Sequence, residues 1–218
     1  MNTDSHFSVK AKGGEAAKDS LAPRQERSRQ TAGKFVSAAM DLLHDKTFAE
    51  LSVAELAKHA KRSVGVFYQR FGSKDDFLEV LLDAFFEESL AWRSEFDVGT
   101  TAEEVYVGFL KRGYESLRDN RNLWHAALER AAAEPDFWDK YHPYRESAGK
   151  ITRAAIEKKL GRALTDAERR KVALAGQVFN SVINNQIING PGPLMFEDDD
   201  FFPELKKIVL QIAEMPKS

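Results

Sequence analysis

The chain has 218 residues, of which 43% are hydrophobic and 30% charged, a balance typical of a globular protein with a buried core. It contains no cysteine, which excludes a disulfide scaffold, a cysteine-ligated zinc site and a cysteine nucleophile. Because no apolar run is long enough to span a membrane and the N-terminus lacks the apolar core of a signal peptide, we expect a cytoplasmic protein.

The net charge of −2 conceals an uneven distribution of charge along the chain. Residues 1–75 contain 13 Lys and Arg against 9 Asp and Glu, whereas the remaining residues contain 19 against 25. A basic N-terminal third followed by an acidic body is typical of proteins whose N-terminal part binds a polyanion such as nucleic acid. Because charge differences of this size also arise by chance, the interpretation as a nucleic-acid-binding protein depends on the sequence motifs.

Residues 1–23 are rich in Ser, Gly, Lys and Ala and lack helical periodicity. This composition predicts a disordered tail that ends at Pro23. The first helix is predicted from about Arg24 to His44. Its buried stripe is expected to contain Phe35, Val36, Ala39, Leu42 and Leu43.

The stretch 52–74 predicts two short helices joined by a tight turn. Ser52 and Glu55 have the spacing of a capping box, in which both side chains bind backbone N–H groups at a helix start. Ser63 is a favourable N-cap for a second helix over residues 64–71, and Gly72 is typical of the glycine that ends a helix. Together with a third helix from Lys74, this pattern describes a helix-turn-helix.

This segment resembles the DNA-binding domain of the tetracycline-repressor (TetR) family of bacterial transcription regulators. The resemblance covers about residues 27–80, and its matching residues are Phe35, Ala38, Ala39, Leu42, Leu43, Phe48, Leu51, Ser52-Val53, Ala57, Ala60, Ser63-x-Gly65-x-Phe67-Tyr68-x-x-Phe71 and Ser73-Lys74. Lys61 stands where the family commonly has a turn glycine, and Arg70 where it commonly has a histidine. Since a side chain at a left-handed turn position has a steric cost, we expect strain at Lys61.

The second helix of the motif is expected to enter the major groove, where base edges present distinct donors and acceptors. Val64 suits a thymine methyl group, Gln69 suits adenine, and Arg70 suits guanine or a phosphate. The resemblance implies phosphate contacts at Ser52, Tyr68 and Lys74. The full set of predicted DNA-binding residues is Ser52, Arg62, Ser63, Val64, Gly65, Phe67, Tyr68, Gln69, Arg70 and Lys74.

The rest of the chain predicts further helices and no paired strands. They are expected at about Lys74–Phe96, Thr101–Arg118, 121–133, 135–143, Tyr144–Leu160, Thr165–Asn189 and Phe201–Met215. Capping boxes start at Thr101 and Thr165, and Gly161 and Gly190 are expected to end helices. Pro143 is expected to bend or interrupt its helix.

Aromatic residues are spread over several of these helices, and most are expected to pack a core. Some are expected to line an apolar cavity that also contains a few polar groups, as small-molecule sites do. The resemblance implies that this part of the chain binds a small effector. The candidate ligand residues are Phe86, Phe109, Tyr114, Trp124, Trp138, Tyr141, Phe179 and Asn180.

The last two helices each carry an apolar stripe. Either both stripes pack into the chain's own core, or they form a four-helix interface with a second copy, which is also how the family dimerises. We predict the interface, with candidate residues Val178, Val182, Leu205, Ile208, Val209 and Ile212.

No motif typical of catalysis or of phosphate binding occurs, neither a Walker loop nor a GxSxG nucleophile. His125 and Glu129 are spaced to share a metal, but no HExxH pattern frames them and an ordinary polar pair is the simpler interpretation. We therefore predict no enzyme, no catalytic residue, no metal site and no cofactor.

The sequence thus predicts an all-α protein with a helix-turn-helix DNA-binding domain over residues 24–75 and a helical ligand-binding and dimerisation domain over residues 76–218. By resemblance, it is a ligand-responsive transcription regulator, most often a repressor, that binds a palindromic operator as a homodimer and is released by an apolar or aromatic effector. Two alternatives remain: a helical ligand-binding protein or enzyme that lacks specific DNA binding, and a sequence-indifferent nucleoid-type binder.

Overall fold

The computed structural model describes residues 22–216, with the backbone alone for residues 22–25 and 27. Within this range the chain is all-α, as predicted, and no strand occurs. The elements are α1 (Ala22–Leu43), α2 (Val53–His59), α3 (Val64–Phe71), α4 (Lys74–Glu95), α5 (Ala102–Asp119), α6 (Arg121–Ala133), η1 (Asp139–Tyr141), α7 (His142–Leu160), α8 (Asp166–Asn189) and α9 (Phe201–Ala213). None of these helices combines the length and apolar character needed to cross a lipid bilayer.

Helix starts and ends follow the capping residues closely. Thr101 and Thr165 both form complete capping boxes, at the starts of α5 and α8. Gly161 and Gly190 end α7 and α8 with φ angles of 67° and 54°, in the left-handed region that favours glycine.

Two predictions about proline were wrong. No α-helix begins at Pro135, because residues 135–138 form turns that lead into the short 3-10 helix η1. Pro143 neither bends nor interrupts a helix, since it lies in the first turn of α7, where its missing N–H has no intrahelical partner to lose. The predicted tail lies outside the described residues, apart from the last two positions, which belong to α1.

The chain divides into two compact units, an N-terminal unit up to Glu88 and a C-terminal unit from Ser89. Helix α4 contributes residues to both. The N-terminal unit is built around four phenylalanine rings, Phe35 on α1, Phe67 and Phe71 on α3, and Phe77 on α4. The Phe67 ring lies 5.5 Å from Phe35, 5.0 Å from Phe71 and 5.1 Å from Phe77, centroid to centroid. These rings hold α3 against α1 and α4.

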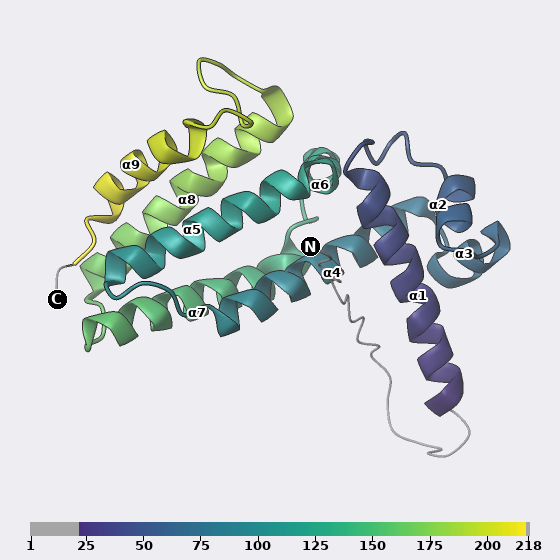
Figure 1. Ribbon diagram of the computed structural model, residues 1–218, viewed down its shortest axis with the longest axis horizontal. Coiled ribbons are helices and arrows are strands. Elements are labelled where there is room, and N and C mark those ends of the chain that lie inside the picture. Colours follow the sequence, from purple (N-terminus) through teal and green to yellow (C-terminus); the bar gives the residue numbers. More distant parts are fainter. Residues whose placement is uncertain (1–21, 217–218) are drawn as a thin grey trace. The chain divides into compact units, whose positions relative to one another are not determined.

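In the C-terminal unit, α8 packs along α9 and α5 packs along α7 (Figure 1). Their inward faces form one apolar core that includes Val105, Ile156 and Ile183, each with no exposed surface. Within this core, the buried Tyr114 hydroxyl donates to the Phe196 carbonyl at 2.6 Å.

Two of the six predicted dimer residues belong to this core instead. Leu205 is 4% exposed and Val209 is fully buried within the chain, because both lie on the face of α9 that packs into its own unit. Their assignment to an intermolecular interface was therefore wrong. Ile208 is 51% exposed, and Val178, Val182 and Ile212 are half-buried, so these four stay candidates.

The turn between α2 and α3 is a Schellman motif. The N–H of Lys61 donates to the Lys58 carbonyl at 3.1 Å, and the N–H of Arg62 donates to the Ala57 carbonyl at 2.9 Å. Lys61 occupies the position that is usually glycine, and its φ angle is 54°. The expected strain at this residue is thereby confirmed, because a Cβ atom at such a φ angle crowds the following carbonyl.

We predict that Lys61→Gly stabilises the protein by about 0.5–1 kcal/mol, because the relief of a left-handed side chain exceeds the added entropy of glycine in the unfolded chain. Urea denaturation followed by circular dichroism measures this change. Lys58→Gly is the matched control: Lys58 lies within α2, where glycine should instead destabilise by about 1 kcal/mol. An earlier unfolding midpoint for Lys61→Gly would contradict the assignment of strain.

Candidate nucleic-acid interface

Helix α3 has one anchored face and one uncovered face. Val64 and Tyr68 are 40% and 50% exposed, and Gly65 and Gln69 are exposed beside them. These four positions are spaced so that they share one side of the helix. The side chains that a major groove would meet therefore project from the unit together.

Phe67 lies on the opposite side of α3 and has no exposed surface. Its ring is enclosed by the other phenylalanines, so its prediction as a DNA contact was wrong. Its contribution to the interface is to fix the helix that carries the exposed residues.

Gly65 is exposed on α3, and nothing inside the chain requires a glycine there. A Cβ atom built at this position would have Ser63 Oγ as its nearest neighbour, at 3.9 Å, which is ordinary contact. Glycine inside a helix destabilises it by about 0.5–1 kcal/mol relative to alanine. A position that costs stability without serving internal packing indicates a close approach by a partner outside the chain.

Arg70, predicted to contact a base or a phosphate, is bound within the protein. Its guanidinium donates to both the backbone carbonyl and the hydroxyl of Ser28 on α1. Partial burial lowers the pKa of Arg70, although the group keeps its charge at neutral pH. Arg70 therefore ties α3 to α1 through one of its nitrogens, and its contact with a base or a phosphate stays a prediction.

Lys74, at the start of α4, is also partly bound. Its ammonium donates to the Ala49 carbonyl at 3.0 Å and lies 4.8 Å from the centre of the Phe48 ring. Desolvation lowers its pKa. Because an ammonium has three donors, this contact leaves others for a phosphate.

Ser52 and Ser63 both cap helices as predicted. The Ser52 hydroxyl accepts from the N–H of Glu55 at 3.1 Å, and the Ser63 hydroxyl accepts from the N–H of Val66 at 3.3 Å. The expected capping box at Ser52 is only half formed, because the Glu55 carboxylate binds the Lys46 ammonium. Both caps place a backbone turn at the exposed start of a short helix.

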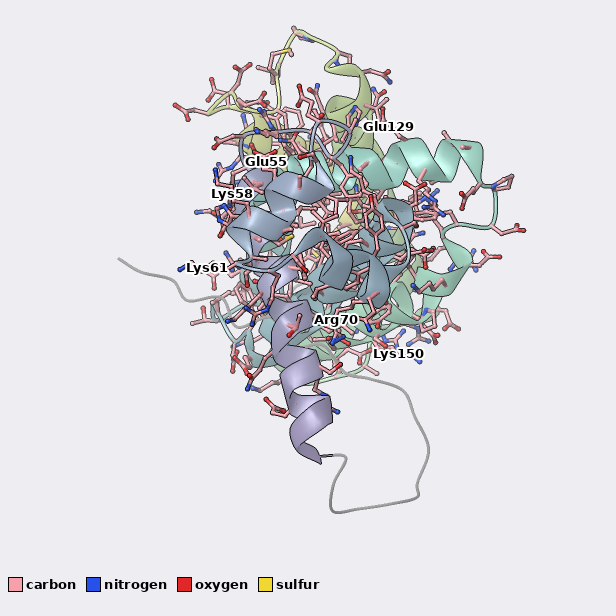
Figure 2. All side chains as sticks on the ribbon, turned by 90° about the vertical axis from the view of Figure 1, so that its right-hand side faces the viewer. Glu55, Lys58, Lys61, Arg70, Glu129 and Lys150 are labelled. Atoms are coloured by element: carbon pink, nitrogen blue, oxygen red, sulfur yellow. The ribbon has the colours of Figure 1, made fainter. Side chains whose placement is uncertain are left out.

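Two further cations near α3 were absent from the predicted set. Lys58 on α2 and Lys61 in the turn are exposed (Figure 2), and neither forms an ion pair with any residue in the described range. Arg62, which was predicted, is half-buried and donates to the Lys61 carbonyl at 2.8 Å. The sequence signal for both lysines is their spacing. Lys61 follows Lys58 by three residues, so it continues the exposed side of α2 into the turn.

The predicted ligand residues do not gather around one cavity. Phe109, Tyr114, Tyr141 and Phe179 are buried in packed surroundings, whereas Asn180 is exposed on α8. Phe86 is buried and belongs to the N-terminal unit.

Trp124 and Trp138 form an aromatic pair on α6 and the turn before η1, with ring centres 5.4 Å apart. The Trp124 indole N–H donates to the Asn184 side-chain oxygen at 2.8 Å. This bond links α6 to α8, so both tryptophans have a structural role.

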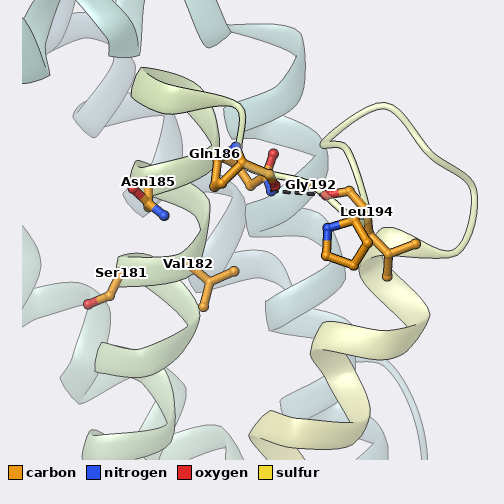
Figure 3. A pocket seen from close by; sticks show the side chains of 8 residues that line it. Ser181, Val182, Asn185, Gln186, Gly192 and Leu194 are labelled. Atoms are coloured by element: carbon orange, nitrogen blue, oxygen red, sulfur yellow. Dashed lines mark hydrogen bonds between the residues drawn. The ribbon is translucent and has the colours of Figure 1, made fainter.

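An open groove lies instead at the C-terminal end of α8 (Figure 3). It has a volume of about 370 Å³ and is lined by Ser181, Val182, Asn185, Gln186, Pro191, Gly192, Pro193 and Leu194. The Gln186 amide donates to the carbonyls of Pro191 and Leu194, at 2.7 and 3.0 Å, and so fixes the loop that forms one wall. None of the eight predicted ligand residues lines this groove.

The helices of the N-terminal unit match a known family. Residues 35–81 match the model for bacterial regulatory proteins of the tetR family. The match covers the helix-turn-helix and its flanking helices, so this part of the chain is similar to the DNA-binding domain of TetR-family regulators. The uncharacterized HTH-type transcriptional regulator YwcC of Bacillus subtilis is 39% identical over 59 residues, which are 27% of this chain and 26% of that protein. The match thus spans about a quarter of the relative's length.

Solved structures of TetR-family proteins share the fold over most of the chain. A regulator from Streptomyces coelicolor has a TM-score of 0.61 at 15% identity, covering 85% of this chain and 80% of its own. A putative regulator from Mesorhizobium loti has a TM-score of 0.59 at 16% identity, covering 86% and 95%. The dihydroxyacetone kinase operon activator DhaS has a TM-score of 0.56 at 17% identity, covering 86% and 97%. At these identities the similarity shows a common fold.

We predict that Gly65→Ala raises the free energy of unfolding by about 0.5–1 kcal/mol and weakens DNA binding, because the added methyl group improves the helix but occupies the space of a partner. Urea denaturation and fluorescence anisotropy with labelled duplex DNA measure the two effects. Gly149→Ala is the matched control, since Gly149 is exposed on α7 and also has open space around it. It should stabilise similarly and leave DNA affinity unchanged; equal DNA affinity for both variants would contradict the proposed approach.

Proposed function

We propose that this protein is a transcription regulator that binds double-stranded operator DNA by inserting α3 into the major groove. The observation that carries this proposal is the uncovered face of α3, with Gly65 at its centre and Phe67 anchoring the opposite side. A single α-helix fits the width of the major groove, and its N-terminal residues usually contact the bases.

Within this arrangement, Val64 and Gln69 contact bases. Val64 lies at the start of α3 and presents an exposed apolar side chain, which suits a thymine methyl group. Gln69 is exposed one turn further and can bind adenine through two hydrogen bonds.

The remaining contacts are to phosphates and position the helix without reading sequence. Tyr68 presents a half-exposed phenol, and Ser52 and Ser63 are exposed at helix starts. Lys58, Lys61 and Lys74 add positive charge around them. Residues 24–75 form the DNA-binding domain in this proposal, and residues 76–218 form the effector-binding and dimerisation domain.

The protein acts as a homodimer in this proposal, because one N-terminal unit covers only a few base pairs. Two recognition helices placed one DNA turn apart would together bind a palindromic site. Support comes from α8, whose uncovered stripe contains Leu174, Val178, Ser181, Asn185 and Ile188. Leu174 and Ile188 are 50% and 41% exposed. Exposed apolar side chains at helical spacing are typical of a surface that a partner covers. On α9, Ile208 and Ile212 extend the same kind of surface.

A small effector releases the operator in this proposal, so that the protein acts as a repressor. The effector must bind the DNA-free state more tightly than the DNA-bound state, since equal affinity would shift nothing. A reporter gene controlled by the operator shows whether the protein represses or activates transcription. If it is a repressor, deletion of the regulator should raise expression of the reporter. The name of DhaS as an activator shows that one protein of this fold acts with the opposite sign.

We predict that Gln69→Ala relaxes preference at one base pair of the operator by about 1–3 kcal/mol, whereas Tyr68→Phe weakens binding to all sequences alike. An operator would first be selected from a random duplex pool, and both variants would then be titrated against it and its single-base variants. Tyr68→Phe is preferable to a change at Lys74, because Lys74 also contacts the Ala49 carbonyl within the head.

Two results would count against this placement of α3. One is a sequence-blind loss of equal size in both variants. The other is a failure of the wild-type protein to enrich any sequence, with affinity set by salt alone, which is the behaviour of a nucleoid-type binder.

We also predict that the double variant Leu174→Asp with Ile208→Asp is monomeric, stays helical and loses operator affinity, because both side chains are half-exposed in the single chain and buried in the dimer. Sedimentation velocity and circular dichroism measure these properties. Val98→Asp is the control, since Val98 is 40% exposed but lies in the loop between α4 and α5. An unchanged dimer in the double variant would place the interface elsewhere.

A further inference from the structure

Two arginines lie against one tryptophan where α4 meets α5 in the C-terminal unit. The guanidinium carbon of Arg93 is 4.4 Å from the centre of the Trp92 ring, and that of Arg112 is 5.9 Å from it. Both cations are therefore held near the same ring, although like charges repel. A favourable cation–π contact accounts for one cation on a ring but does not remove the repulsion between two.

Arg93 has no acidic partner among the described residues. Its Nε atom donates to the Ser89 hydroxyl at 3.3 Å, and its guanidinium carbon lies 5.9 Å from the Phe109 ring. Burial lowers its pKa to about 10, with no carboxylate nearby to offset the effect. Buried arginines are normally paired, because an uncompensated charge is costly away from water.

The terminal nitrogens of Arg93 have donors to offer, since the only hydrogen bond that this side chain makes within the described range uses Nε. One of these nitrogens lies beside Gly113 on α5, 3.6 Å from where a Cβ atom would stand. The next residue back along α5 is Arg112, which is exposed. A terminal nitrogen of Arg93 thus lies beside the part of α5 that carries Arg112.

Trp92 adds a third donor. Its indole N–H is buried and has no acceptor within residues 22–216. A buried donor without a partner costs about 1–3 kcal/mol. Two guanidinium groups therefore lie near one indole ring whose own N–H has no acceptor in the described range, and guanidinium groups are donors that suit an anion.

The surroundings of these donors are aromatic. Trp92 lies 5.6 Å from Phe96 and 6.1 Å from Phe109, and the two phenylalanine rings are 5.0 Å apart. Of these rings, Trp92 and Phe96 are partly exposed, and exposed aromatic rings stabilise a flat apolar body, which inorganic phosphate does not have. A guanidinium also matches the two oxygens of a carboxylate through parallel hydrogen bonds.

We propose that Arg93 and Arg112 bind the carboxylate of a small aromatic acid, whose ring lies against the partly exposed rings of Trp92 and Phe96. This site specifies the chemistry of the effector and in that respect rests on the proposed function. The proposed effector is therefore anionic as well as aromatic, whereas the sequence predicted an apolar or aromatic effector.

Isothermal titration calorimetry of the full-length protein with benzoate tests the site without DNA. Benzyl alcohol carries the same ring without the charge, and inorganic phosphate carries charge without the ring. Benzoate should bind, and both other compounds should bind at least about tenfold more weakly, since charge-assisted hydrogen bonds and ring contact both contribute. Equal affinity for benzyl alcohol or for phosphate, or no heat of binding with benzoate, would overturn the proposal.

Arg112→Gln and Arg93→Gln should each lower benzoate affinity by about tenfold or more. Arg112 is exposed, so its variant keeps the fold even if the partly buried Arg93 proves necessary for stability. Arg118→Gln is the matched control: Arg118 is also exposed on α5 and lies 5.7 Å from the Tyr114 ring, but it already pairs with Asp119. Equal losses in Arg112→Gln and Arg118→Gln would show a general charge effect and overturn the site.

Adding benzoate to the protein–operator complex separates the two proposals. Release of DNA in the wild type but not in Arg112→Gln supports both. Benzoate binding to a protein that selects no operator would leave the anion site standing and remove the proposed function. Operator binding by a protein that does not bind benzoate would keep the proposed function and overturn the anion site.

Discussion

The geometry of the N-terminal unit depends on the burial of a single ring. Phe67 is enclosed by Phe35, Phe71 and Phe77, at distances typical of edge-to-face and tilted aromatic pairs. Removing such a ring from a core usually costs about 3–5 kcal/mol. Because α3 has only eight residues, it is too short to be stable alone and takes its orientation from this contact. The exposed face of α3 is therefore a consequence of which face Phe67 buries.

Helix bounds were predictable because they depend on neighbouring residues. Ser63, Thr101 and Thr165 cap the helices that they were expected to start, and the relevant donors lie only three positions away. Predictions failed where the outcome depended on longer contacts. Pro135 has the local chemistry of a helix start, yet the aromatic residues after it pack with Trp124 and Tyr141 in a turn. The periodicity of apolar residues does not reveal whether such packing overrides a local helix signal.

The candidate sites were less predictable, because a side chain's partner is not encoded by its spacing. Arg70 has the chemistry of a base contact, and only the approach of α1 shows that Ser28 binds it. Ile208 and Val209 are adjacent and equally apolar, yet one is 51% exposed and the other fully buried. The unpaired donors around Trp92 come from two helices, and no motif links them. Each of these assignments needed the distances between elements.

The bond between Arg70 and Ser28 has a consequence for how the N-terminal unit folds. It joins residues 42 positions apart, so it forms only after the chain between them has closed into a loop. The helix-turn-helix segment thus depends on α1 for part of its tertiary contacts. A shortened chain that lacks α1 would lose both Ser28 and Phe35, the residues through which α1 holds α3. The minimal fragment that could be transplanted as a working module therefore begins at α1.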